Sequence, residues 1–145
     1  MRALIQRVAH ARVEVGDRTV GRIGRGLLVF LGVQRGDDAA RARAMATRLL
    51  AYRVFADAEG RMNLDVRRVG GGVLLVSQFT LAADTSRGLR PGFSCAAEPA
   101  IARELYEETL RSLREEHADV ACGEFGADMQ VSLQNDGPVT FLLEL

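Results

Sequence analysis

The chain has 145 residues, of which 48% are hydrophobic and 26% are charged, and its 19 basic residues, all arginine, balance 19 acidic residues. This length predicts one domain spanning residues 1–145, and zero net charge excludes long-range steering of a polyanion, so any contact with RNA has to be local. No apolar run approaches the roughly 20 residues of a membrane span, which predicts a cytoplasmic protein without a membrane partner. Cys95 and Cys122 are too few and too isolated for a disulfide framework or a metal cluster, so we expect reduced thiols and no metal.

The first half of the chain predicts three strands and a helix. Residues 2–15 alternate as a long strand, Gly16-Asp17 turns the chain into a second strand ending near Ile23, and residues 27–31 form a short buried strand. Asp37 is a candidate N-cap for a helix over residues 38–54, where apolar residues recur at helical spacing.

The second half predicts a helix among further strands. Residues 73–80 form another buried strand, and a polar, glycine-rich loop runs from 82 to 93. Pro99 suits the first turn of a helix that runs to about His117, and strands are expected near 120–125, 128–134 and 139–145. The fold class is therefore mixed α+β: one compact domain of mixed β-sheets covered by two main helices on one side, in a β/β/α layered sandwich.

Conventional catalytic machinery is missing from the sequence. The chain has two histidines, His10 in an alternating strand and His117 at a helix end, and both positions are more typical of surface residues than of a general base. No nucleophile elbow, Walker loop, zinc-protease motif or dinucleotide fingerprint occurs. Any catalysis must therefore depend on holding and polarising the substrate.

Two short segments stand out against this background. Ser77-Gln78-Phe79-Thr80-Leu81 puts three hydrogen-bonding side chains where an apolar strand ends, an arrangement that could orient a substrate or could only satisfy the strand's own backbone. Gly137-Pro138 interrupts two strand-like runs, and because proline lacks an N–H and glycine lacks Cβ, the pair could present free backbone carbonyls to a ligand or could be a simple turn.

Other candidate residues have weaker support. Arg87 and Arg90 lie in the polar loop, where they are either solvated or contacts for phosphate groups of a ligand. Phe125 and Met129 are most simply core residues, but Gly126 beside them could let a planar base approach.

Ser77-Gln78-Phe79-Thr80-Leu81 and Asn135-Asp136-Gly137-Pro138-Val139-Thr140 resemble the two signature motifs of the D-aminoacyl-tRNA deacylases. Their order and their separation of about 55 residues make the resemblance specific. It extends over nearly the whole chain. It implies a cytoplasmic, homodimeric hydrolase that cleaves the ester joining a D-amino acid, or glycine, to the 3′-terminal adenosine of tRNA. It further implies no metal, no cofactor and no DNA partner.

The resemblance also implies roles for individual residues. Gly137 and Pro138 would be joined by a cis peptide, reach into the partner subunit's site and reject L-amino acids, steadied by Arg7 across the dimer. A sister group holds the same peptide in trans, and the sequence alone is compatible with both forms. Catalysis would involve Thr80, as nucleophile or only as an orienting group, with Gln78 and Ser77. The pocket would be lined by Phe79, Phe125 and Met129.

Two rival interpretations remain at this point. The chain could be a non-catalytic tRNA-binding homologue that keeps the fold without turnover, or a dimeric interaction domain in which Gly137-Pro138 is only a strand-switching turn. Enantiomer-selective loss of the ester distinguishes the enzyme from both.

Overall fold

A computed structural model describes residues 1–86 and 88–145. A six-stranded mixed sheet has the order β2-β1-β3-β6-β7, with β8 paired to β1, and a separate two-stranded sheet is formed by β4 and β5. The strands are β1 (Arg2–Val15), β2 (Arg18–Ile23), β3 (Gly26–Gly32), β4 (Phe55–Ala56), β5 (Met62–Leu64), β6 (Gly72–Ser77), β7 (Val120–Cys122) and β8 (Gln130–Glu144). The helices are α1 (Ala39–Ala51), the short 3₁₀ helix η1 (Phe79–Ala82) and α2 (Pro99–Glu116).

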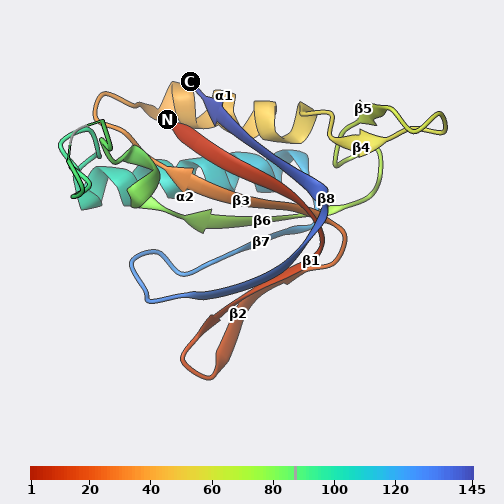
Figure 1. The fold of residues 1–145 in the computed structure, drawn as a ribbon, viewed down its shortest axis with the longest axis horizontal. Helices are drawn as coiled ribbons and strands as arrows, with labels where there is room; N and C mark the ends of the chain where they lie inside the picture. The colour runs from red at the N-terminus through yellow and green to blue at the C-terminus, as the bar shows by residue number, and fades with distance from the viewer. Residues whose placement is uncertain (87) are drawn as a thin grey trace.

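The layers follow from two long, bent strands. β1 and β8 pair along their whole length, and both bend sharply (Figure 1). Their outer halves, residues 8–15 of β1 and 130–135 of β8, lie with β2 on the opposite side of β3 and β6 from the helices. α1 and α2 cover the other face. The predicted α+β class, with two helices on one side of layered strands, is confirmed.

Both faces of the central strands are buried, and each contributes to a different core. In β6, Val73 and Leu75 pack in the core that includes Met45 of α1 and Leu105 of α2, while Leu74 packs with the outer halves of the strands. Since successive side chains of a strand point to opposite faces, an uninterrupted apolar run is what a strand buried on both faces requires.

Helix α1 begins one residue later than predicted, because Asp38 and not Asp37 is its N-cap. The Asp38 Oδ1 accepts a hydrogen bond from the Arg41 backbone N–H at 2.8 Å. Asp37 is instead drawn into the preceding turn, where its Oδ2 accepts from the Gln34 N–H at 2.7 Å. The helix also ends at Ala51, short of the predicted residue 54.

The strand predicted over 73–80 was too long at its carboxyl end. It ends at Ser77, and the chain turns into η1, where the Leu81 N–H donates to the Gln78 carbonyl at 3.2 Å. Thr80 therefore lies in a tight turn beyond the sheet. The strand predicted over 120–125 is likewise limited to Val120–Cys122.

The two strands predicted at 128–134 and 139–145 form one strand, β8. The side chain of Asn135 bridges the Gly-Pro interruption: its Oδ1 accepts from the Val139 N–H at 2.7 Å, and its Nδ2 donates to the Thr140 Oγ1 at 3.1 Å. Pairing with β1 shifts register there and then resumes, from Val8 opposite Asn135 to Gln6 opposite Thr140. The side chain thus replaces ladder bonds that the bulge removes.

Candidate active site

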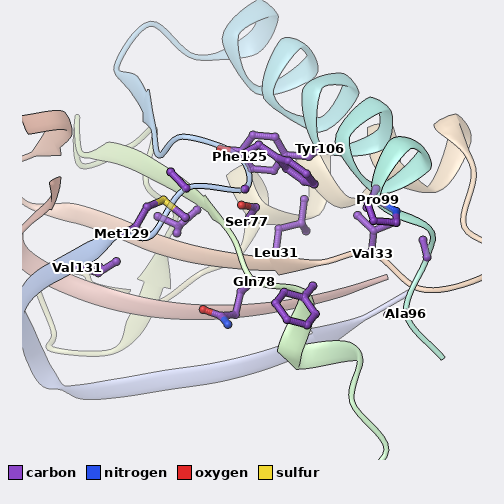
Figure 2. Close-up of a pocket in the computed structure, with 16 residues that line it drawn as sticks. Leu31, Val33, Ser77, Gln78, Ala96, Pro99, Tyr106, Phe125, Met129 and Val131 are labelled. Carbon is purple, nitrogen blue, oxygen red and sulfur yellow. The ribbon is translucent and has the colours of Figure 1, made fainter. Parts of the chain in front are cut away.

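A pocket of about 420 Å³ opens at the carboxyl ends of β3 and β6, beneath the start of α2. Its lining combines strand ends, the segment before α2, one face of α2, and the connection between β7 and β8 (Figure 2). The residues are Leu31, Val33, Val76, Ser77, Gln78, Phe79, Ala96, Ala97, Pro99, Ala102, Tyr106, Phe125, Gly126, Ala127, Met129 and Val131. Most are apolar, so the pocket suits a flat, weakly polar group better than a charged one.

Tyr106 and Phe125 form an aromatic wall of this pocket. Their ring centroids lie 5.7 Å apart, and the buried Tyr106 hydroxyl donates to the Leu75 carbonyl at 2.9 Å. Burial raises the pKa of Tyr106 above the ordinary value for tyrosine, with the neighbouring Cys122 adding to the effect. The hydroxyl therefore stays protonated near neutral pH and fixes the ring in place.

Two of the three predicted catalytic residues line the pocket. Ser77 ends β6 and lies beneath the aromatic wall, whereas the Gln78 amide extends away from that wall (Figure 2). Thr80 does not line the pocket, but its Oγ1 accepts a hydrogen bond from the Gln78 Nε2. Gln78 thus joins the pocket to the Thr80 hydroxyl at the surface.

Phe79, Phe125 and Met129 all line the pocket. The Phe79 ring is 61% exposed and lies 5.2 Å from Phe93, so it stands at the mouth. Phe125 and Met129 are half-buried and come from the connection between β7 and β8. Together they provide one exposed and two half-buried hydrophobic contacts.

Among the described residues, no carboxylate, histidine or arginine lines the pocket. The titratable side chain in its wall is Tyr106, whose raised pKa makes it a poor base. Polar contact is limited to Ser77, Gln78 and backbone groups. Such a site can orient a substrate and polarise a carbonyl, but it supplies no general base of its own.

Gly137-Pro138 lies toward the amino ends of β3 and β6, whereas the pocket lies at their carboxyl ends. The bulge that they form in β8 lies opposite the part of β1 between Gln6 and Val8. In the sheet, Val8 pairs with Gly26 on β3, and Gly26 in turn pairs with Gly72 on β6. Ser77 is five residues further along β6, which is roughly 16 Å at the rise of a strand. Neither Gly137 nor Pro138 lines the pocket of the same chain.

The Gly137-Pro138 peptide bond is cis, in agreement with the expectation from the resemblance. Arg7 holds the segment on its own chain: the Nε donates to the Asp136 carbonyl at 2.9 Å and Nη1 donates to the Val54 carbonyl at 2.6 Å. A Cβ on Gly137 would lie 2.7 Å from Val139 Cγ2 and 2.8 Å from its backbone nitrogen. Only glycine fits here, with both residues of the pair exposed to solvent.

The predicted phosphate contacts are not brought to the pocket. Arg90 is exposed on its loop and does not line the pocket, and Arg87 lies outside the described residues. Tyr106, which lines the pocket from α2, is not among the site residues that the sequence predicted. A tyrosine hydroxyl on the buried face of this helix was the available signal, because a buried hydroxyl needs a partner.

Within residues 1–86 and 88–145, no three His, Cys, Asp or Glu side chains gather closely enough to hold a metal ion. The helices of that part of the chain are not long and apolar enough to cross a membrane.

Comparison with known proteins assigns the chain to a family. The model of the "D-Tyr-tRNA(Tyr) deacylase" family matches residues 4–144. The chain belongs to this family. A D-aminoacyl-tRNA deacylase of Stutzerimonas stutzeri is 61% identical over 144 residues, covering 99% of both chains, and one of Saccharophagus degradans is 57% identical over all 145 residues and 100% of both. Membership confirms the predicted family and enzyme class, a hydrolase.

Two solved structures are similar to this D-Tyr-tRNA(Tyr) deacylase family member. One, described as a c-Myc DNA unwinding element binding protein, is 38% identical, covers 100% of this chain and 99% of its own, and superposes with a TM-score of 0.95. The other, a probable eukaryotic D-amino acid tRNA deacylase, covers 99% and 98% with a TM-score of 0.85 at 17% identity, which supports the fold alone.

Proposed function

We propose that this chain hydrolyses the ester of D-aminoacyl-tRNA, as a proofreading step of translation in the cytoplasm, with the 3′-terminal adenosine held in the pocket beside Tyr106 and Phe125. The single observation that supports this most strongly is the pocket itself. It is apolar and aromatic-walled at one end and bordered by Ser77 and Gln78, in a chain whose family hydrolyses this ester. Unstacked bases are commonly bound on aromatic side chains in this way.

The size of the pocket limits what it takes from the tRNA. At about 420 Å³ it lies in the range of roughly 300–1,000 Å³ typical of small-molecule sites. A nucleoside with a small acyl group suits that volume, while the body of a tRNA has to stay outside. Together with a net charge of zero, this favours a local footprint at the 3′ end.

Gly137-Pro138 from a second copy completes the site in this proposal. The pair is exposed, held by Arg7, and about the length of a short strand away from the pocket of its own chain. A backbone carbonyl cannot rotate aside as a side chain can, so a fixed wall can occupy the space that an L side chain needs. Glycine has no side chain to reject, and glycyl-tRNA is therefore a second expected substrate.

The chemistry proposed for the pocket uses a group of the substrate. An aminoacyl ester is already activated, and no carboxylate or histidine lines the described part of the pocket to activate water. The 2′-hydroxyl of the terminal ribose can assist the attack of water on the neighbouring ester carbonyl. Ser77, Gln78 and Thr80 orient the substrate and polarise this carbonyl. Thr80 is assigned orientation above covalent attack, because its hydroxyl contacts an amide that cannot accept its proton as a base would.

A tRNA ending in 2′-deoxyadenosine tests this assistance. With the D-amino acid attached at the 3′ position, we expect hydrolysis at least about 100-fold slower than for the ribose form, in the range of a lost acid–base contribution. Quenched time courses of ester loss measure the rate, and equal binding of the two forms is the control. Hydrolysis at the normal rate would exclude the role of the 2′-hydroxyl.

The activity itself is tested with matched D- and L-aminoacyl-tRNA of one amino acid. Purified protein should remove the D ester and leave the L ester intact, and glycyl-tRNA should be cleaved. Equal loss of both enantiomers would contradict the proposed filter, and binding of tRNA without loss of either ester would support the non-catalytic interpretation instead.

A further inference from the structure

Arg103 is the cation that contacts the aromatic wall of the pocket. It lies on α2 one residue after Ala102 and three before Tyr106, both of which line the pocket. Its guanidinium carbon lies over the Phe125 ring, 4.8 Å from the centroid. Phe125 therefore contacts both Tyr106, a ring that lines the pocket, and an exposed positive charge.

The guanidinium keeps most of its hydrogen-bonding capacity free. Its Nη2 donates to the Phe125 carbonyl at 3.5 Å, which is at the limit for a hydrogen bond, and a guanidinium carries five N–H donors. Within residues 1–86 and 88–145 no carboxylate pairs with it, although nine other arginines have such partners. Glu124, the acid next to Phe125, is already paired with Arg18 at 3.2 Å.

We propose that Arg103 binds the phosphate that joins the 3′-terminal adenosine to the preceding nucleotide. This inference rests on the proposed function, because it assumes that the adenine lies against the wall containing Phe125. Arg103 lies beside a residue that lines the pocket, because a Cβ on Gly126 would be 4.0 Å from the Arg103 Nη2. The 5′-phosphate of a nucleoside is one sugar away from its base, so a base against Phe125 leaves that phosphate within reach of Arg103. Arginine matches phosphate oxygens with paired N–H donors, and a charge at this rim supplies the local recognition that a molecule of zero net charge needs.

The assignment differs from a purely structural role in one measurable respect. If Arg103 only holds Phe125 in place, its loss weakens the binding of adenosine and of adenosine 5′-monophosphate by the same factor. If it binds the phosphate, the loss affects only the ligand that carries one. Binding of these two ligands therefore separates the two roles without requiring turnover.

The experiment compares the wild type with Arg103→Gln, Arg103→Lys and the control Arg111→Gln by NMR titration with both ligands. Arg111 lies further along the same helix, is paired with Glu108 and does not line the pocket, so its change removes the same charge elsewhere. We expect the wild type and Arg111→Gln to bind the monophosphate about tenfold more tightly than adenosine. Arg103→Gln should lose that preference, and Arg103→Lys should keep part of it. The KM for D-aminoacyl-tRNA should rise about as much in Arg103→Gln, with kcat little changed.

Two results would overturn the inference. One is a wild-type protein with equal affinity for both ligands. The other is an Arg103→Gln variant whose affinity for both ligands falls by the same factor. Thermal melting of each variant checks that the fold is intact. A wild type that prefers the monophosphate through Arg103 but leaves D-aminoacyl-tRNA uncleaved would uphold this contact and contradict the proposed function.

Discussion

Tyr106 shows how one residue can belong to the core and to the site. Its hydroxyl satisfies the Leu75 carbonyl inside the protein, while its ring faces the pocket beside Phe125. Apolar periodicity places such a residue on the buried face of a helix, but it cannot distinguish a packed ring from one that borders a cavity. That difference depends on the end of β6 and on the connection before β8, which are far away in the sequence.

Tyr106→Phe should lower the free energy of unfolding by about 1 kcal/mol near neutral pH, because it removes a buried hydrogen bond and keeps the ring. The pKa of Tyr106 is raised by burial, so the folded state favours the protonated hydroxyl and wild-type stability falls once the unfolded chain ionises, above about pH 10. The Phe variant has no such group, and the difference between the two proteins should shrink there.

Urea unfolding at several pH values measures this difference. Tyr52→Phe is the matched control, because the ring of Tyr52 packs on Phe141 away from the pocket. A Tyr106→Phe variant as stable as the wild type near neutral pH, or a difference that widens in alkali, would contradict the account of this residue.

At the scale of the element, helix α1 depends on one carboxylate at its start. Asp38→Ala removes the acceptor for the Arg41 N–H and should cost about 1 kcal/mol of stability, whereas Asp38→Asn keeps an acceptor and should cost much less. Thermal or urea unfolding of the two variants measures the effect. Equal losses in both variants would show that the charge matters, and not the cap.

The elements that sequence predicted well are those defined by local pattern. The alternation of residues 2–15, the turn at Gly16, where φ is +56°, and both main helices follow from periodicity and backbone preference. Ser77 and Phe79 were identified at the end of an apolar strand, and both line the pocket.

The elements that were predicted less well depend on contacts between distant residues or between side chain and backbone. Asp37 and Asp38 are identical in type, and only their contacts decide which one is the cap. The unbroken course of β8 through Gly137-Pro138 depends on the Asn135 side chain and on pairing with β1. The exclusion of Thr80 from the pocket follows from η1, a turn that the apolar run of β6 does not predict.

At the scale of the whole molecule, the two signature segments lie near opposite ends of the central strands β3 and β6 in one subunit. The register of β1, β3 and β6 separates Gly137-Pro138 from Ser77. The pocket is lined by residues of the segment that begins at Ser77 and by neither Gly137 nor Pro138. Two copies arranged so that each inserts its Gly-Pro into the other would form two complete sites. In such a dimer, pocket and filter can be inactivated on separate chains.

A heterodimer measures this arrangement directly. One chain carries Ala127→Trp, which fills its pocket, and the other carries Pro138→Ala, which frees the backbone that a proline ring restricts. The Pro138→Ala homodimer should cleave L-aminoacyl-tRNA as well as the D form, and the Ala127→Trp homodimer should cleave neither. In the purified heterodimer the open pocket receives the intact Gly-Pro of its partner, so it should cleave the D ester at about half the wild-type rate and leave the L ester intact. Cleavage of the L ester by the heterodimer, at about half the rate of the Pro138→Ala homodimer, would contradict a filter supplied by the second copy.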